Sequence, residues 1–244
     1  MVKCRQIFQK ILDFIYPPAC PLCNAGVSMH GELCADCWTA INWIDGPKCA
    51  RCGYPFIAGY DFDKEMLCPV CAAGKNELDW IRSACVYDDA SKQVMLPFKH
   101  CGKIKYARFM ANAMIWALRD TDLSDIDVVM PVPLAWRRLY HRGYNQATLL
   151  ARPIAHALGV KLDYDSVRRK YRADMGHKTA KQRAQNIRGV FTVVRPNRIR
   201  GKRILLVDDV MTSGATFGEL HKVLMRAGAA SVCGVSFCRV VHGV

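Results

Sequence analysis

A short apolar strand that ends in two acids and a turn of small residues is the feature that most restricts how this chain can fold. Residues 204–207 read Ile-Leu-Leu-Val, and Asp208 and Asp209 follow them directly. A turn rich in Thr, Ser and Gly comes next, at 212–216, and opens into a helical pattern that ends at Gly228. A strand joined to a helix in this way is typical of an α/β sheet, where ligands bind beyond the carboxyl ends of the strands.

The rest of the sequence from residue 80 onward predicts the same fold class. We expect strands at 81–87, 128–130, 189–194, 204–207 and 231–240, and helices at 104–118, 145–158 and 215–227. Strand–helix alternation predicts a mostly parallel sheet with flanking helices on both faces. Residues 168–186 show no apolar periodicity, so we expect a long loop there. In compact domains such loops often act as lids over a site.

The turn and the two acids have the chemistry of a sugar-phosphate site. Backbone N–H groups at the start of a helix favour an anion such as phosphate. Two adjacent carboxylates at a strand end are costly unless they accept hydrogen bonds from sugar hydroxyls or help hold a cation. The alternative is a turn that only caps the helix, because Ser and Thr are ordinary N-cap residues. The coincidence of apolar strand, acid pair and turn favours the ligand site.

Eight of the thirteen cysteines form four Cys-x-x-Cys pairs, which predict two metal sites. Two such pairs supply the four thiolates of one tetrahedral zinc ion, and a four-thiolate site has no open position, so both zinc ions should be structural. Disulfides and an iron–sulfur cluster are the alternatives. The simplest grouping gives the first two cysteine pairs to one zinc ion and the last two pairs to the other. An interleaved grouping of the pairs has the same sequence signature. The ligands are Cys20, Cys23, Cys34, Cys37, Cys49, Cys52, Cys68 and Cys71.

The remaining cysteines and the N-terminal segment predict no further site. Single cysteines in apolar surroundings behave as small buried hydrophobes, and we expect this of Cys4, Cys85, Cys101, Cys233 and Cys238. Residues 1–16 have apolar positions at helical spacing, which favours a short amphipathic helix docked on its own protein, with a membrane-surface anchor as the alternative. We expect a double zinc ribbon at 17–74 and an α/β domain at 80–244.

The sequence predicts neither a transmembrane segment nor a signal peptide. No run approaches the ~20 apolar residues that a transmembrane helix needs, and the N-terminus lacks the apolar stretch and cleavage site of a signal peptide. Paired cysteines without a secretory signal are typical of metal ligands in a reducing compartment. We therefore expect a cytoplasmic protein without a transmembrane segment.

Positive charge is concentrated in one part of the chain. Residues 168–203 hold thirteen Lys or Arg and one acid, Asp174, a net charge of +12 within a total of +14. Such a local excess predicts a polyanionic partner, either a phosphorylated small molecule or nucleic acid. The alternative is a solvated surface that only aids solubility.

Several motifs resemble those of known proteins. The segment 207–216 resembles the motif by which class I phosphoribosyltransferases bind phosphoribosyl pyrophosphate (PRPP). Three further segments, 96–100 (Leu-Pro-Phe-Lys-His), 131–134 (Pro-Val-Pro-Leu) and 142–146 (Arg-Gly-Tyr-Asn-Gln), are similar to signatures of the ComF/GntX family. The four cysteine pairs match that family's double zinc ribbon. The resemblance covers nearly the whole chain.

The resemblance implies a role for each residue of the motif. Asp208 and Asp209 would contact the ribose hydroxyls, and the 5-phosphate would lie in a cradle formed by Thr212, Ser213, Gly214, Ala215 and Thr216. The loop after the strand at 128–130 would bind pyrophosphate together with Mg²⁺, and Arg137 and Arg142 would supply charge there, because a guanidinium binds phosphate through two hydrogen bonds. Arg183 is the leading catalytic candidate on the loop at 168–186.

Two functions follow from these expectations, and the family supplies a third. The first is an enzyme that transfers phosphoribosyl from PRPP to an unknown acceptor and releases pyrophosphate. The second is a single-stranded-DNA-handling protein of natural transformation, with competence proteins as partners, that uses the PRPP fold for binding or regulation. Gluconate-type carbon uptake is another association of the family, which this sequence neither supports nor opposes.

Overall fold

The computed structural model of the 244-residue chain describes residues 14, 16–56, 63–74, 76, 78–100, 104–170 and 187–241. The side chains of His100, Arg138, His141 and Arg142 are not among the parts described. The helix expected over 1–16 and the loop expected over 168–186 therefore lie outside the described residues, except for Phe14, Tyr16 and residues 168–170.

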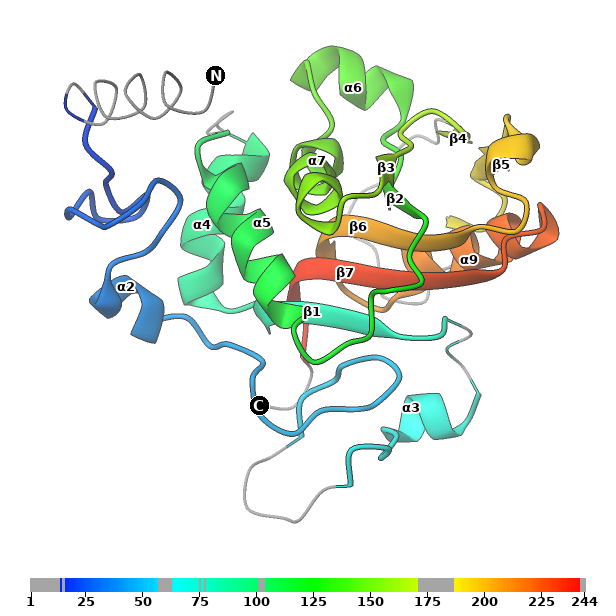
Figure 1. The fold of residues 1–244 in the computed structure, drawn as a ribbon, viewed down its shortest axis with the longest axis horizontal. Coiled ribbons are helices and arrows are strands. Elements are labelled where there is room, and N and C mark those ends of the chain that lie inside the picture. The colour runs from blue at the N-terminus through cyan, green and yellow to red at the C-terminus, as the bar shows by residue number, and fades with distance from the viewer. Residues whose placement is uncertain are drawn as a thin grey trace.

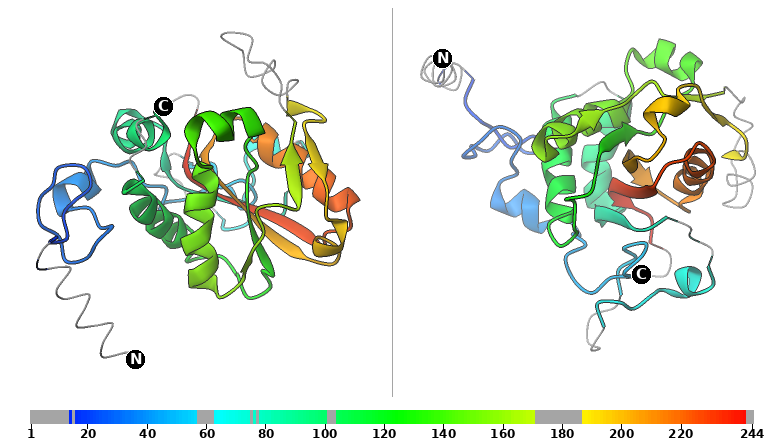
Figure 2. Two further views of the ribbon diagram at one scale, coloured as in Figure 1. Left: turned by 90° about the horizontal axis from the view of Figure 1, so that it is seen from above. Right: turned by 45° about the vertical axis from the view of Figure 1, so that its right-hand side comes forward.

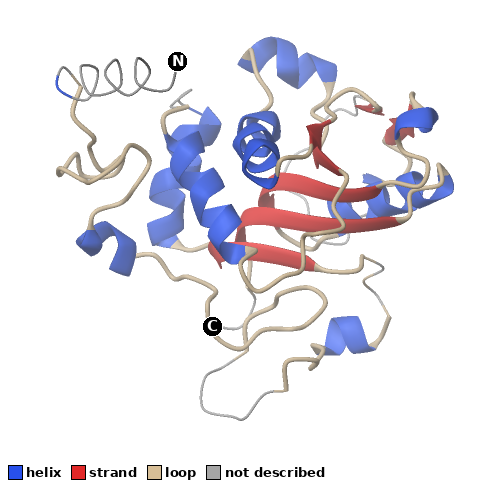
Figure 3. Ribbon diagram, viewed as in Figure 1, coloured by secondary structure: helices blue, strands red, loops and turns tan. Residues whose placement is uncertain are grey.

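A five-stranded parallel sheet forms the centre of the molecule (Figures 1 and 3). Its strand order is β1-β7-β6-β2-β3, and every neighbouring pair runs parallel. The strands are β1 (Ile81–Val86), β7 (Ser231–Arg239), β6 (Arg203–Met211), β2 (Val128–Pro131) and β3 (Lys161–Leu162). The predicted mostly parallel α/β fold is confirmed.

Helices cover both faces of this sheet (Figure 2). One face packs against α4 (Asp89–His100), α5 (Tyr106–Ala117) and α7 (Gln146–Leu158). The other face packs against α9 (Ala215–Arg226) and the antiparallel pair of β4 (Val167–Arg169) and β5 (Phe191–Val193). The short elements are α2 (Ala35–Thr39), α3 (Pro69–Ala72), α6 (Trp136–Arg142) and the 3-10 helix Pro196–Arg198.

The side chains of β6 contribute to two hydrophobic cores, one on each face of the sheet. Leu205 and Val207 are fully buried in the core on the α5 and α7 side, whereas Ile204 and Leu206 are fully buried in the core on the α9 side. Successive side chains of a strand point to opposite faces, so an unbroken apolar run is what a strand covered on both sides requires.

Several expected elements differ from the observed ones. We expected β6 to end at Val207, but it extends to Met211 and therefore contains both acids. The extension follows from its pairing with β7, which continues as far as Met211 and Arg239. Helices α4 and α6 were not expected. Pro97 interrupts the helical pattern of α4, and α6 lies where the sequence predicts a loop. The expected loop at 168–186 also begins too early, since Arg168 and Arg169 belong to β4.

The cysteine-rich segment lies against the same domain in two places. Near its first four cysteines, Trp38 stacks on Trp43 with ring centroids 4.3 Å apart, and both contact Trp116 of α5 edge-on. Near the second four, the Ile81 N–H donates to the Arg51 carbonyl over 2.7 Å, which ties the segment to β1. Contacts with the α/β domain, rather than a periodic apolar pattern of its own, therefore hold this segment in place.

The cysteines outside the pairs lie where the sequence predicts, as far as they are described. Cys85, Cys233 and Cys238 are buried in the core, and Cys4 and Cys101 lie outside the described residues. In the part of the chain that the structure describes, no helix is both long enough and apolar enough to cross a bilayer.

Candidate functional site

The two cysteine clusters have the geometry of zinc sites. Within each cluster the four Sγ atoms lie within 4.8 Å of one another, with 3.5 Å between the Sγ atoms of Cys23 and Cys34 and 3.6 Å between those of Cys52 and Cys68. Thiolates that share one zinc ion at ~2.3 Å stand about this far apart. The grouping is sequential: a first cysteine cluster of Cys20, Cys23, Cys34 and Cys37, and a second of Cys49, Cys52, Cys68 and Cys71.

Backbone donors prepare the second cysteine cluster for a metal. The N–H groups of Cys52 and Cys68 point at Cys49 Sγ from 3.5 and 3.3 Å. Burial alone would raise the pKa of Cys49, but these two N–H groups, together with the Arg51 backbone and the Cys52 side chain, outweigh burial and lower the pKa to about 7. A thiol that ionises near neutral pH is suited to binding zinc, because the thiolate is the ligand.

The turn at 212–216 connects β6 to α9. Gly214 occupies the N-cap position with φ +75°, a conformation that favours glycine, and glycine has no side chain with which to cap the helix. Thr212 and Ser213 are exposed. The N-cap of α9 is therefore a glycine rather than a Ser or Thr, so no N-cap side chain occupies the backbone N–H groups of the first turn in the part of the chain that the structure describes.

The acid pair lies inside β6, and Lys99 from the end of α4 reaches it. Lys99 Nζ lies 3.2 Å from Asp209 Oδ2, and Asp209 is 8% exposed. The Asp209 N–H donates to Asp208 Oδ1 over 2.9 Å. Burial, together with the negative charge of Asp209, raises the pKa of Asp208 to about 8. Burial works against the charge of Lys99, but Asp209 and Asp208 outweigh it and raise the pKa of Lys99.

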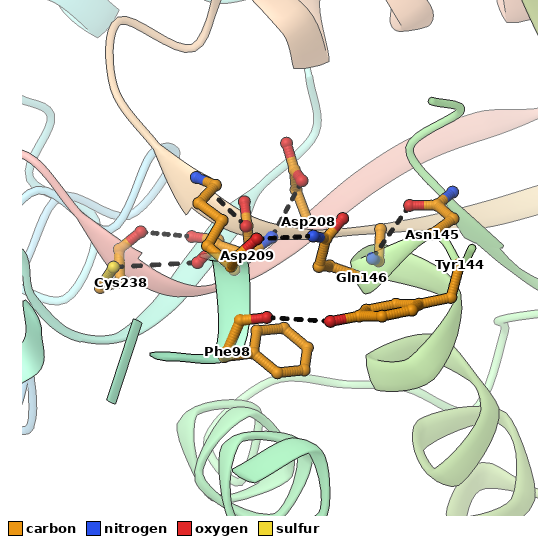
Figure 4. Close-up of polar contacts among 10 residues, drawn as sticks. Phe98, Tyr144, Asn145, Gln146, Asp208, Asp209 and Cys238 are labelled. Atoms are coloured by element: carbon orange, nitrogen blue, oxygen red, sulfur yellow. Dashed lines mark hydrogen bonds and ion pairs between the residues drawn. The ribbon is translucent and has the colours of Figure 1, made fainter. Parts of the chain in front are cut away.

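Two motifs that are far apart in the sequence meet beside this acid pair (Figure 4). The Tyr144 hydroxyl donates to the Phe98 carbonyl over 3.3 Å, and Gln146 Nε2 donates to the Lys99 carbonyl over 3.3 Å. Asn145 caps α7 by accepting from the Ala147 N–H over 3.1 Å. The 142–146 motif thus braces the end of α4, which carries Lys99. Lys99 belongs to the motif at 96–100, but nothing in the sequence pattern marks it as a site residue.

The arginines expected to bind phosphate are only partly described. Arg137 is exposed on α6 with its guanidinium 5.5 Å from the ring centroid of Trp136. Arg142 also belongs to α6, but its side chain is not described, and Arg183 lies outside the described residues. The structure therefore brings together Asp208, Asp209, the turn and Lys99, and leaves the arginine roles as predictions.

Part of the basic stretch at 168–203 is paired with acids. Arg195 and Arg198 both form ion pairs with Asp165. Lys202 lies 3.6 Å from Asp127, and Arg203 pairs with Asp125. The net charge of +12 therefore overstates the charge available to a polyanion, since at least four cations among the described residues of this stretch have neighbouring carboxylates.

Family models match both the cysteine-rich segment and the α/β domain. A family model described as a double zinc ribbon domain matches residues 11–73, and one described as a phosphoribosyl transferase domain matches residues 145–243. These two models together cover most of the chain, and they agree with the cysteine clusters and with the sheet that carries the acid pair.

Curated relatives match nearly the full length. The DNA utilization protein YhgH of Salmonella typhi is 31% identical over 233 residues, which cover 92% of this chain and 98% of that protein. Competence protein F of Haemophilus influenzae is 29% identical, with 86% of this chain and 90% of that protein covered. Competence protein ComFC of Bacillus subtilis is 26% identical, with 85% and 84% covered.

Solved structures match just over half of the chain, and more distantly. An allosteric regulatory enzyme of purine biosynthesis is 22% identical with a TM-score of 0.37, and the match covers 53% of this chain and 25% of that chain. An adenine phosphoribosyltransferase of Thermoanaerobacter pseudethanolicus is 17% identical with a TM-score of 0.35, covering 57% and 83%. On the strength of the full-length relatives and the two domain models, the chain belongs to the ComF family, whose members join a double zinc ribbon to a phosphoribosyltransferase-type domain.

Proposed function

We propose that the α/β domain binds PRPP with Mg²⁺ and transfers its phosphoribosyl group to an acceptor, releasing pyrophosphate. The observation that carries the proposal is the juxtaposition of β6 and α9. An acid pair, with Asp209 held by Lys99, lies two residues before a turn in which Gly214 is the helix N-cap. The phosphoribosyl transferase model, which spans residues 145–243, supports the proposal.

Each residue of this site has a proposed task. Backbone N–H groups of the turn at 212–216 bind the 5-phosphate, because the start of a helix favours an anion. Asp208 and Asp209 accept hydrogen bonds from the ribose hydroxyls, and Lys99 positions Asp209. Oxygen ligands together with substrate phosphates suit Mg²⁺, which would offset the charge of the diphosphate.

The reaction needs a stabilised leaving group more than a strong protein nucleophile. The bond from ribose C1 to the pyrophosphate oxygen breaks, with its electron pair leaving on pyrophosphate, and a lone pair of the acceptor forms the new bond to C1. Positive charge develops on the ribose, so water must be excluded and the pyrophosphate must be neutralised. Arg137 and Arg142 are proposed for the second task, and Arg183 is proposed to close over the site.

Two measurements test this function. Isothermal titration of the zinc-loaded protein with PRPP and Mg²⁺ tests binding, and an acceptor screen that detects released pyrophosphate tests turnover. The double substitution Asp208→Asn with Asp209→Asn should abolish both signals. Pyrophosphate release that survives in this double variant would contradict the assignment.

The relatives favour a second candidate, a cytoplasmic protein that handles single-stranded DNA. Those from Haemophilus influenzae and Bacillus subtilis are named competence proteins, and that from Salmonella typhi a DNA utilization protein. A DNA-binding function predicts that affinity falls by about 0.7 log units per log unit of salt for each phosphate neutralised. Neutralising Lys178, Lys181 and Arg188 should reduce that slope, whereas absence of binding at low salt would reject this candidate.

A further inference from the structure

Lys99 offers hydrogen-bond donors that its partner in the protein does not use. An ammonium group has three N–H donors, and in the described part of the chain its one acceptor is Asp209, whose Oδ2 lies 3.2 Å from Nζ. The side chain of Lys99 is 31% exposed, whereas that of Asp209 is 11% exposed. The cation is therefore the more accessible member of this pair, and it can donate to a bound ligand as well.

Lys99 also keeps its positive charge in this partly buried position. Burial favours the neutral amine, but the carboxyl groups of Asp209 and Asp208 outweigh burial and raise the pKa of Lys99. A lysine ammonium is a common binder of phosphate groups, to which it presents a point charge. The charge and the remaining donors together suit a phosphate oxygen.

The backbone contacts place Lys99 between the acid pair and the loop that follows β2. Asn145 Nδ2 donates to the carbonyl of Val132, where this loop begins, over 3.0 Å. The next residue, Gln146, donates to the Lys99 carbonyl (Figure 4). The strand β2 itself pairs with β6, which carries the acids. A substrate that extends from the acid pair to the loop after β2, as the proposed function requires of PRPP, therefore passes Lys99.

We propose that Lys99 contacts the substrate: its ammonium donates to a pyrophosphate oxygen of PRPP while it keeps its ion pair with Asp209. This inference rests on the proposed transferase function and adds to it a residue that neutralises the leaving group. Lys99 stays protonated throughout. When the bond from ribose C1 to the pyrophosphate oxygen breaks, the ammonium stabilises the negative charge that develops on pyrophosphate. Tyr144 and Gln146 are positioning residues, because they hold the backbone of α4 at Phe98 and Lys99.

Two ligands separate this role from one of only positioning Asp209. PRPP and ribose 5-phosphate share the ribose hydroxyls and the 5-phosphate, and only PRPP carries pyrophosphate. The zinc-loaded full chain is titrated with each ligand in the presence of Mg²⁺, as wild type and as Lys99→Met. We expect the substitution to weaken PRPP binding about 10-fold more than ribose 5-phosphate binding, because a hydrogen bond to a charged group is lost for PRPP alone.

Three further variants complete the experiment. Lys92→Met, on the same helix, removes a lysine that pairs with the exposed Asp89 and should bind both ligands as the wild type does. Lys99→Arg retains a cation and should recover part of the lost PRPP affinity. Lys99→Gln can still donate to Asp209 but has no charge, so it should show the same selective loss as Lys99→Met. If Lys99→Met does not fold, Lys99→Gln decides.

The outcomes distinguish this inference from the proposed function on which it rests. Unchanged PRPP affinity in Lys99→Met and Lys99→Gln, or an equal loss for both ligands, overturns the contact with pyrophosphate and leaves the proposed transferase standing. A wild-type protein that binds no PRPP overturns both.

Discussion

Lys99 Nζ lies 3.2 Å from Asp209 Oδ2, so an ion pair joins the end of α4 to the strand that carries both acids. The backbone of Lys99 is in turn held by Gln146 at the start of α7. Three elements that are separate in the sequence therefore fix the position of one carboxylate. This arrangement keeps the acid pair in place before any ligand arrives, which is what a preorganised site requires.

Removing the cation of this pair should destabilise the protein. Lys99→Met leaves the nearly buried Asp209 without its partner, and we expect a loss of about 1–3 kcal/mol in the free energy of unfolding. The control is Lys92→Met on the same helix, where an exposed lysine pairs with the exposed Asp89 and little change is expected. Urea unfolding of both variants checks this prediction. Equal losses in the free energy of unfolding would show that the Lys99–Asp209 pair stabilises the protein no more than an exposed ion pair does.

The raised pKa of Asp208 predicts the direction of a pH effect on stability. Between its ordinary value of 3.8 and about 8, the folded state holds a proton that the unfolded state has released. The stability that the protonated Asp208 contributes is therefore complete below about pH 4. It is lost progressively as the pH rises from there through the folded-state pKa of about 8. The stability difference between wild type and Asp208→Asn should shift against the wild type from pH 6 to pH 8.5. A pH-independent difference in urea unfolding would contradict the raised pKa.

Loss of one zinc ligand should have unequal effects in the two clusters. Cys49 is buried beside residues that contact β1 and β7, whereas Cys23 is exposed. Cys49→Ser and Cys23→Ser should each reduce the zinc content from two ions to one, and Cys49→Ser should lower the melting temperature of the whole protein more. Metal analysis and calorimetry check both statements. A larger effect of Cys23→Ser would mean that the first cluster, not the second, supports the sheet.

Two glycines provide a matched test of the packing under α9. A Cβ at Gly234 of β7 would lie 2.8 Å from the ring of Phe217, which is 1% exposed and cannot move aside easily. Gly234→Ala should therefore cost about 1–3 kcal/mol through overpacking. Gly218→Ala meets open space in a helix and should gain up to ~1 kcal/mol. If Gly234→Ala is neutral in thermal unfolding, the sheet and α9 pack less closely than described.

The sequence predicted those features that depend on local pattern. The apolar run at 204–207 predicted a strand buried on both faces, and the spacing of the cysteines predicted two clusters. Features that depend on tertiary contacts were missed. The pairing of β6 with β7 extends the strand through the acids, and Lys99 becomes a site residue only because α4 ends beside Asp209. The ion pairs of Arg198 and Lys202 likewise require acids from distant segments.

The most direct test of the central claim is calorimetric titration of the zinc-loaded protein with PRPP and Mg²⁺. The account predicts saturable binding of one PRPP per chain, which disappears when Asp208→Asn and Asp209→Asn are combined. No heat of binding in the wild type, or unchanged affinity in the double variant, would contradict the claim that this acid pair and the turn after it hold a phosphoribosyl group.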